Sequence, residues 1–446
     1  MELKPKSRRE VEGIVQDAIA SAVDFVESEI SQDRIKAQRY YDGEVDLGYE
    51  DGRSKVVATK VRDTVRAVKP SLMRIFLSTA KPVEFVPHGP EDVAMAEQAT
   101  EFMHHEFTRL NGYRVINDAF QDALVKKQGI VKAYWMTYPE AEIYTFTDLN
   151  DDELAYLTDD DEVSVLEQTT EMSISMDEMG MEIETPSHSI KISRQQEKGE
   201  LCIESVPPEE FFVNRDARNL KDAYLVAHRT EMRAGDLIAM GYDPEVVLDL
   251  NSFDNGSEMT EAEVHERRGY DLDTSDEDEQ DPSMKNVTVT EAYMRIDADG
   301  TGIPVLHKIT CGGTSYEMLD FEPCDELPFA KFEIDPEPHT FYGRSLAEIV
   351  MDDQDAATSI LRSILDNVAM TNNPRLAVIE GAANIDDVLN NEIGAIVRMR
   401  QDGAVQDLSV PFTAGQTLGA LTYLDGLVET KTGVSRASMG LDPDAM

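Results

Sequence analysis

The chain has 446 residues, of which 41% are hydrophobic, so it is long enough for a sizeable core and for two or three domains. It carries 41 basic and 88 acidic residues, which gives a formal net charge of −47. This balance excludes DNA binding by broad neutralisation of phosphates, because such binding requires cationic groups. The acidic surplus by itself is equally typical of a soluble, self-repelling surface.

The cysteines and the lengths of the apolar runs indicate which cross-links, metal sites and membrane segments to expect. The three cysteines, Cys202, Cys311 and Cys324, form no CxxC pair, so neither a disulfide framework nor a zinc site is predicted. Polar residues follow Met1, and no signal peptide is expected there. No apolar run approaches the roughly 20 residues that span a bilayer. We therefore expect a protein that is made in a cytoplasm and has no membrane partner.

Residues 1–128 are predicted to be mainly helical. Apolar residues recur at helical spacing over residues 9–41, and the pattern ends at Gly43, a common helix terminator. Ser54 is expected to cap the next helix, and Pro70 to break or kink it. Further helices are expected over residues 91–110 and 115–127.

Residues 129–340 are predicted to be mainly β, beginning with a buried strand over 129–138 and continuing with segments of period two. Two acidic tracts interrupt this region. Residues 151–184 hold thirteen Asp or Glu and no Lys or Arg, and residues 254–281 hold twelve acidic residues. We expect both tracts to be solvated loops or disordered insertions. The prolines and alternating apolar residues of 206–217 predict an ordered corner.

A long uninterrupted helix is predicted from Leu346 to Thr371. Ser345 and Glu348 fit a capping box at its start, and the segment contains no Pro or Gly. At 1.5 Å per residue its length would be about 40 Å. A core helix of one large domain is the alternative interpretation of this segment.

A small β-α-β-β unit is predicted next, followed by a returning helix over 414–432. Its strands are expected over 375–381, 394–400 and 404–410, and its short helix should be capped by Asn384. About 35 residues are few for an independent core, so we expect such a unit to need partner surfaces.

Several segments, in their order along the chain, resemble the portal (head-to-tail connector) proteins of tailed phages of the short-tailed type. The helix–small unit–helix layout adds to this resemblance, which spans about residues 38 to 442. The segments are Gln38-Arg39-Tyr40-Tyr41, Val206-Pro207-Pro208-Glu209-Glu210-Phe211, Tyr342-Gly343-Arg344-Ser345-Leu346, Leu365-Asp366-Asn367, Thr371-Asn372-Asn373-Pro374, Thr432-Gly433-Val434-Ser435-Arg436 and Gly440-Leu441-Asp442.

The resemblance implies an α+β, portal-like fold with a helical and β-rich wing, a two-helix stem and a small α/β clip. The implied divisions are a wing over 1–340, a first stem helix in 341–372, a clip over 373–412, a second stem helix in 413–432 and the start of a tunnel loop over 433–446.

The resemblance also implies a ring of twelve subunits at one capsid vertex of the virion, assembled in the host cytoplasm. Double-stranded DNA would pass through this ring during packaging and ejection. The implied partners are the terminase large subunit, the head-tail adaptor and the major capsid protein, and no cofactor is implied.

Candidate site residues follow from this resemblance. If twelve copies assemble, the formal charge would be 12 × −47 = −564, and an acidic wall would avoid holding the DNA phosphates. We expect Asp352, Asp353 and Asp355 to line the channel. Candidates for binding partners at the clip are Asp386, Asp387, Arg398 and Arg400, although for the two arginines an ordinary charged strand edge explains the pattern equally well.

An enzyme and another virion structural protein are the two alternative classes. The sequence contains no GxxxxGK[ST], GxSxG or HExxH motif, which disfavours an enzyme. His104 and His105 are adjacent, but no other His or Cys cluster joins them, so a polar helix face is favoured over a metal site. Another virion structural protein, such as a head-tail adaptor, remains the alternative function.

Overall fold

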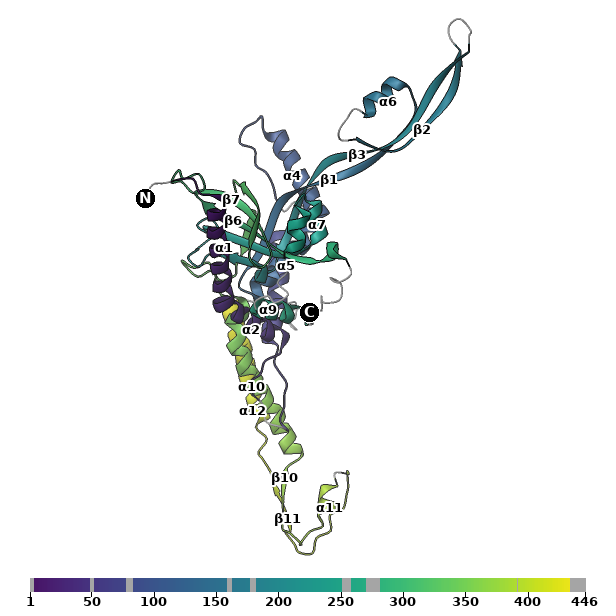
Figure 1. Cartoon of the computed structure of the whole chain (residues 1–446). Coiled ribbons are helices and arrows are strands. Elements are labelled where there is room, and N and C mark those ends of the chain that lie inside the picture. Colours follow the sequence, from purple (N-terminus) through teal and green to yellow (C-terminus); the bar gives the residue numbers. More distant parts are fainter. Residues whose placement is uncertain are drawn as a thin grey trace. The chain divides into compact units, whose positions relative to one another are not determined.

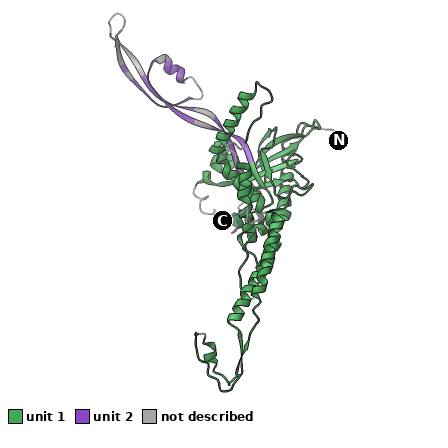
Figure 2. Cartoon of the chain, turned by 180° about the vertical axis from the view of Figure 1, so that it is seen from behind, with its two compact units in different colours: residues 1–131, 205–446 green, residues 132–204 purple. Residues whose placement is uncertain are grey.

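The computed structural model describes residues 4–48, 52–77, 83–158, 163–176, 182–250, 258–269, 281–390 and 392–433. These residues form two compact units, which Figure 2 distinguishes by colour. The larger unit comprises residues 1–131 and 205–446, and the smaller unit comprises residues 132–204.

The predicted helix over 9–41 is present, but it contains a change of winding. Helix α1 (Arg8–Phe25) runs into a π-helical turn, η1 (Val26–Ile30), and then into α2 (Ser31–Asp42). The side chains of Ser7 and Glu10 form a reciprocal capping box at the start of α1. Gly43 ends α2 in the left-handed conformation, as predicted.

A five-stranded antiparallel sheet forms the centre of the larger unit. Its strand order is β4-β5-β6-β7-β8. The apolar face of α1 packs on this sheet through residues such as Val15 and Ile19, which contact the region of Leu225 and Ile309. The strands are β4 (Phe211–Val213), β5 (Leu225–Arg233), β6 (Asn286–Ile296), β7 (Val305–Gly312) and β8 (Glu317–Pro323).

The corner predicted over 206–217 is ordered. The turn η2 (Pro208–Glu210) leads into β4, and the side-chain oxygen of Asn214 accepts hydrogen bonds from the backbone N–H groups of Tyr224 and Leu225. Phe211 is buried against Phe329 of β9 (Phe329–Phe332) and against Phe341.

Three further helices belong to the larger unit: α3 (Lys60–Leu77), α4 (Val93–Arg109) and α5 (Gly112–Val125). The prediction that Ser54 caps α3 is wrong, because the helix starts at Lys60, six residues later. The backbone N–H of Ser54 donates to Asp366. The helix also continues past Pro70 to Leu77.

The acidic tracts contain more regular structure than predicted. Part of the second tract is helix α9 (Glu258–Arg268), while residues 254–257 and 270–280 lie outside the described residues. Two short helices, α7 (Ala234–Ala239) and α8 (Pro244–Asp249), precede it, and the turn η3 (Pro282–Met284) follows it.

The smaller unit contains the whole of the first acidic tract. Its strands are β1 (Gly129–Leu149), β2 (Val163–Met176) and β3 (Glu182–Val206), and its helix is α6 (Asp151–Thr158). The loop prediction is wrong here because Asn150 and Glu153 cap the start of α6 reciprocally, and because β2 pairs with β3 in an antiparallel ladder.

A pair of long helices and a small tip complete the chain (Figure 1). The predicted helices are α10 (Leu346–Asn372) and α12 (Ala414–Thr432), and they pack side by side. Between them lie β10 (Arg375–Val378), α11 (Ile385–Leu389) and β11 (Val405–Leu408).

One predicted strand of the tip is absent. Over residues 394–400 only an isolated bridge between Ala383 and Met399 forms. The bridge is made by two backbone hydrogen bonds, from the N–H of Arg400 to the Ala382 carbonyl and from the N–H of Asn384 to the Arg398 carbonyl. The N–H of Arg398 donates to the Asp387 carboxylate instead, so it is not available to extend a ladder.

Candidate functional site: the paired helices and their tip

The paired helices begin at a cap that the sequence specifies locally. The hydroxyl of Ser345 accepts a hydrogen bond from the backbone N–H of Glu348 (3.1 Å), and the Glu348 carboxylate accepts one from the N–H of Ser345 (2.9 Å). The first turns of α10 then enter an apolar core through Leu346 and Val350, against residues of α2, α3 and α5. The helix is therefore anchored at its first end by burial and by its cap.

The three aspartates that were predicted to line a channel lie in different surroundings. Asp353 is 6% exposed and binds the Lys431 ammonium of α12 at 2.7 Å. Asp355 accepts a hydrogen bond from the Tyr40 hydroxyl at 2.9 Å. Asp352 is exposed. Of the three, Asp352 is the one with an exposed side chain.

The surroundings of Tyr40 raise the pKa of its hydroxyl. Burial of its phenol, followed by the hydrogen bond to Asp355 and the charges of Asp355 and Asp352, raises the pKa of Tyr40 to about 12. The hydroxyl therefore stays protonated and remains a donor to Asp355 well above neutral pH.

Asn367 joins the two helices near the tip. Its side-chain N–H donates to the Pro411 carbonyl at 3.0 Å, and its side-chain oxygen accepts from the backbone N–H groups of Thr413 (3.0 Å) and Ala414 (3.2 Å). The backbone N–H groups at a helix start have no partner within the helix. Asn367 therefore caps α12 from across the hairpin, where Thr413 makes no side-chain cap of its own.

The tip is held by a two-stranded ladder and by one ion pair. Strands β10 and β11 pair antiparallel, with Arg375 opposite Leu408. Arg398 contacts Asp387 through two side-chain hydrogen bonds of 2.6 and 2.9 Å, and this pairing lowers the pKa of Asp387 to about 2. Two of the residues predicted to bind partners therefore bind each other, while Asp386 and Arg400 are exposed.

Large apolar side chains are exposed throughout the tip and along α12. Ile393 is fully exposed, Leu389 is 72% exposed and Tyr423 is 69% exposed. The others in residues 376–423 are Leu376, Ile379, Ile385, Ile396, Val397, Met399, Leu408, Val410, Phe412 and Leu418. Isolated exposed apolar residues are ordinary, whereas a concentration of them is typical of surfaces that bind another molecule.

Sequence reasoning missed a polar row on α10. Gln354, Thr358, Arg362 and Asp366 occur at every fourth position, and each bonds to the backbone of residues 48–61. A spacing of four places side chains on one side of a helix, and this spacing was the available signal. Buried Gln354 also donates to the Tyr40 carbonyl at 3.0 Å, so it joins the end of α2 to the start of α3.

A second group that the sequence did not reveal is a buried ionic cluster. Arg267 of α9 contacts Glu209 at 2.8 Å and Asp122 at 3.2 Å, and Lys126 lies 3.6 Å from Glu209. Burial alone would raise the pKa of Glu209, but the charges of Lys126 and Arg267 outweigh it and bring the pKa to about 2. The members come from segments far apart in sequence, and spacing therefore gave no signal.

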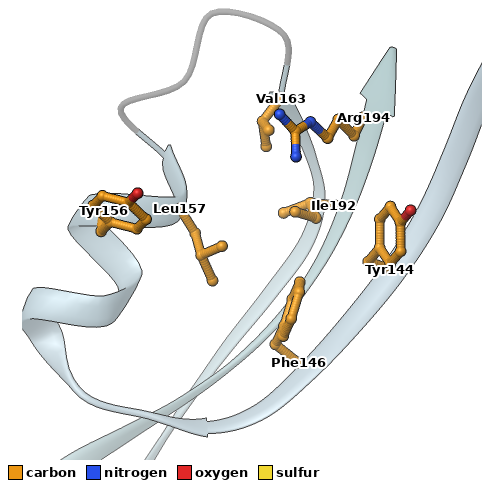
Figure 3. A pocket seen from close by; sticks show the side chains of 7 residues that line it. All are labelled: Tyr144, Phe146, Tyr156, Leu157, Val163, Ile192 and Arg194. Carbon is orange, nitrogen blue, oxygen red and sulfur yellow. The ribbon is translucent and has the colours of Figure 1, made fainter. Parts of the chain in front are cut away.

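The smaller unit contains a pocket of about 570 Å³, shown in Figure 3. Tyr156 and Leu157 of α6 form one wall, and strand residues that include Phe146 and Ile192 form the other. Arg194 is the charged residue among the lining side chains. None of the predicted site residues lies in this pocket.

The described residues offer neither a metal site nor a membrane-spanning helix. Among them, no group of three or more His, Cys, Asp or Glu side chains is arranged to hold a metal ion. None of their helices combines the length and the apolar character needed to cross a membrane.

Paired helices with an exposed, apolar tip are typical of proteins that assemble with other chains. A family model described as "Phage SU10 portal protein" matches residues 11–446. The chain belongs to this family, and it is a phage portal protein of mixed α+β fold. A search of curated proteins gave no match. The family is structural rather than enzymatic, and it places the protein in the phage head.

Proposed function

We propose that twelve copies of this chain form a ring at one vertex of the capsid, through which DNA is packaged and later ejected. The observation that carries this proposal is the concentration of exposed apolar side chains over residues 376–423. In a ring, adjacent copies would cover this surface, whereas a monomer would leave it in water.

The proposed division of the chain follows the elements. Residues 1–340 form the wing, with a mainly helical part over 1–128 and a mainly β part over 129–340. Residues 341–372 and 413–432 are the stem helices, and residues 373–412 are the clip. The proposed start of a tunnel loop over 433–446 lies outside the described residues after residue 433.

The clip is the proposed docking site for the terminase large subunit during packaging, and afterwards for the head-tail adaptor. Asp386 and Arg400 are exposed there and supply both signs of charge for recognition. The wing is proposed to meet the major capsid protein. Assembly is proposed to take place in the host cytoplasm.

The proposed channel works by charge and geometry rather than by reaction. Twelve copies would carry a formal charge of 12 × −47 = −564. An acidic lining repels the DNA phosphates and so keeps the moving duplex from being held. Asp352 is the stem carboxylate best suited to this role, since Asp353 and Asp355 are engaged within the subunit.

Electron microscopy and native mass measurement of the purified chain test the proposed ring. We expect rings with a central hole and a mass of 12 × 49.8 kDa, about 598 kDa. Leu418→Asp should disrupt the rings by placing a charge on the apolar surface of α12, where Leu418 is 55% exposed. Leu248→Asp, which places the same charge on exposed Leu248 of α8, is the matched control. Monomers at high concentration in the unmodified protein would overturn the proposal.

A further inference from the structure

Residues 52–59 form an extended segment, here called the strap, that lies along α10 before the chain enters α3. The strap makes no ladder with a strand. Its backbone instead forms hydrogen bonds with the polar row on α10, and the strap and the helix run in opposite directions. The N–H of Ser54 donates to Asp366 at 2.8 Å, and that of Ala58 donates to Thr358 at 3.1 Å.

Arg362 occupies the middle of the contact. Its guanidinium donates to the carbonyls of Val56 at 2.9 Å, Lys55 at 3.4 Å and Gly48 at 3.3 Å. At the far end the side-chain oxygen of Gln354 accepts from the N–H of Val61 at 2.9 Å, in the first turn of α3. The row thus runs over thirteen residues, Gln354 to Asp366, and its ends are about 18 Å apart along the helix.

The first part of α10 and the part beside the strap are held by different forces. Leu346, Ala347, Val350 and Met351 pack in an apolar core. From Gln354 onward, the contact with the strap depends on hydrogen bonds between side chain and backbone. A backbone group of the strap that loses such a partner must bond to water or remain unpaired. The order of the strap therefore depends on the order of α10.

We infer that the strap and α10 order as one unit, so that a change at the tip-proximal end of the row is transmitted to the start of α3 and the end of α2. Asp366 lies six residues before Asn372, the last residue of α10, whereas Gln354 bonds to both α2 and α3. Coupling of this kind is reciprocal, because each end changes the equilibrium of the other. The inference concerns the single subunit and does not depend on the proposed ring.

Residue-resolved amide hydrogen exchange on the full-length protein tests the coupling. Asp366→Ala removes the acceptor at the tip-proximal end, and Thr358→Val removes the acceptor of the Ala58 N–H while keeping a similar shape. For Asp366→Ala we expect exchange at Ala58 and Val61 to rise about fivefold, the effect of losing one net hydrogen bond on an opening equilibrium. For Thr358→Val we expect the same rise at Ser54 and Val61.

Ser363→Ala is the control, because the Ser363 hydroxyl bonds to the Ser359 carbonyl within α10 and does not contact the strap. Exchange in the strap should be unchanged in this variant. If each strap variant accelerates exchange only at the amide that lost its acceptor, the segments open independently and the inference is overturned. An equal rise in exchange across the five-stranded sheet would also overturn it, since the variant would then lower global stability.

Discussion

At the scale of single residues, Gln354 has an unusually large structural role. One buried side-chain amide serves the last turn of α2 and the first turn of α3. The Tyr40 carbonyl also accepts from the N–H of Gly43, so the N–H of Val61 is the group that would lose its partner. We expect Gln354→Met to lower the free energy of unfolding by about 1 to 3 kcal/mol, the cost of one unsatisfied buried group. Urea unfolding measures this loss, and Ser359→Ala on the exposed side of α10 should change stability little.

Glu209 is a second residue whose replacement should strongly lower the stability of the fold. Replacing it with Gln would leave Lys126 and Arg267 without their shared buried carboxylate. Breaking a buried ion pair by removing one partner costs about 3 to 5 kcal/mol. Thermal unfolding of Glu209→Gln should show this loss, whereas Glu210→Gln, at the more exposed neighbouring carboxylate, should show a much smaller one. Equal stability of the two variants would contradict this account of the cluster.

At the scale of elements, the tip should lose order in acid. The folded-state pKa of Asp387 lies at about 2, below its ordinary value of 3.8, so its contribution to stability is present above pH 3.8 and is lost as pH falls towards 2. Amide exchange at Arg398, corrected for its intrinsic rate, should be constant from pH 7 to 5 and should rise in this acid window. Asp387→Asn should abolish the pH dependence, and Asp386→Asn should retain it.

The elements also show which structures the sequence could predict. The bounds of α10 and α12 follow from apolar periodicity, and α10 also has a local cap, so both helices were predicted to within one residue. The start of α3 was missed, and the N–H of Ser54 donates to Asp366, which lies 312 residues away in sequence. The strand predicted over 394–400 is missing because Asp387 takes the backbone N–H and side chain of Arg398.

For the candidate site, the sequence predicted residues but not the contacts that they make. Acidic residues on α10 were proposed from the family resemblance and the net charge, but the pairing of Asp353 with Lys431 and of Asp355 with Tyr40 depends on helices that meet only in the fold. The ionic cluster depends on three segments, the end of α5, η2 and α9, that no local pattern connects. Local signals therefore identified the elements, whereas tertiary contacts decided which of their charges remain exposed.

At the scale of the whole molecule, Asp352 provides a test of the proposed channel. We expect Asp352→Lys to slow or stall DNA packaging, because twelve new cations would attract the phosphates. A packaging assay with assembled heads measures the rate. Asp249→Lys makes the same change of charge on exposed Asp249 of α8 and is the matched control. Packaging at the normal rate by Asp352→Lys rings would count against an acidic wall at this position.

The π-helical turn η1 has a consequence for how insertions and deletions act on this protein. The helix from Arg8 to Asp42 serves two cores, since α1 packs on the sheet and α2 packs on α10 through Ala37 and Tyr40. A π turn holds one residue more than an α turn, and one residue is about 100° of rotation. Deleting one residue within Val26–Ile30 would let this turn revert to an α turn and would keep the faces of α1 and α2 in phase. Deleting one residue from an α-helical stretch between the two cores would instead rotate α2 by about 100° relative to α10. The π turn is therefore the place where this helix can change its length by one residue and still serve both cores.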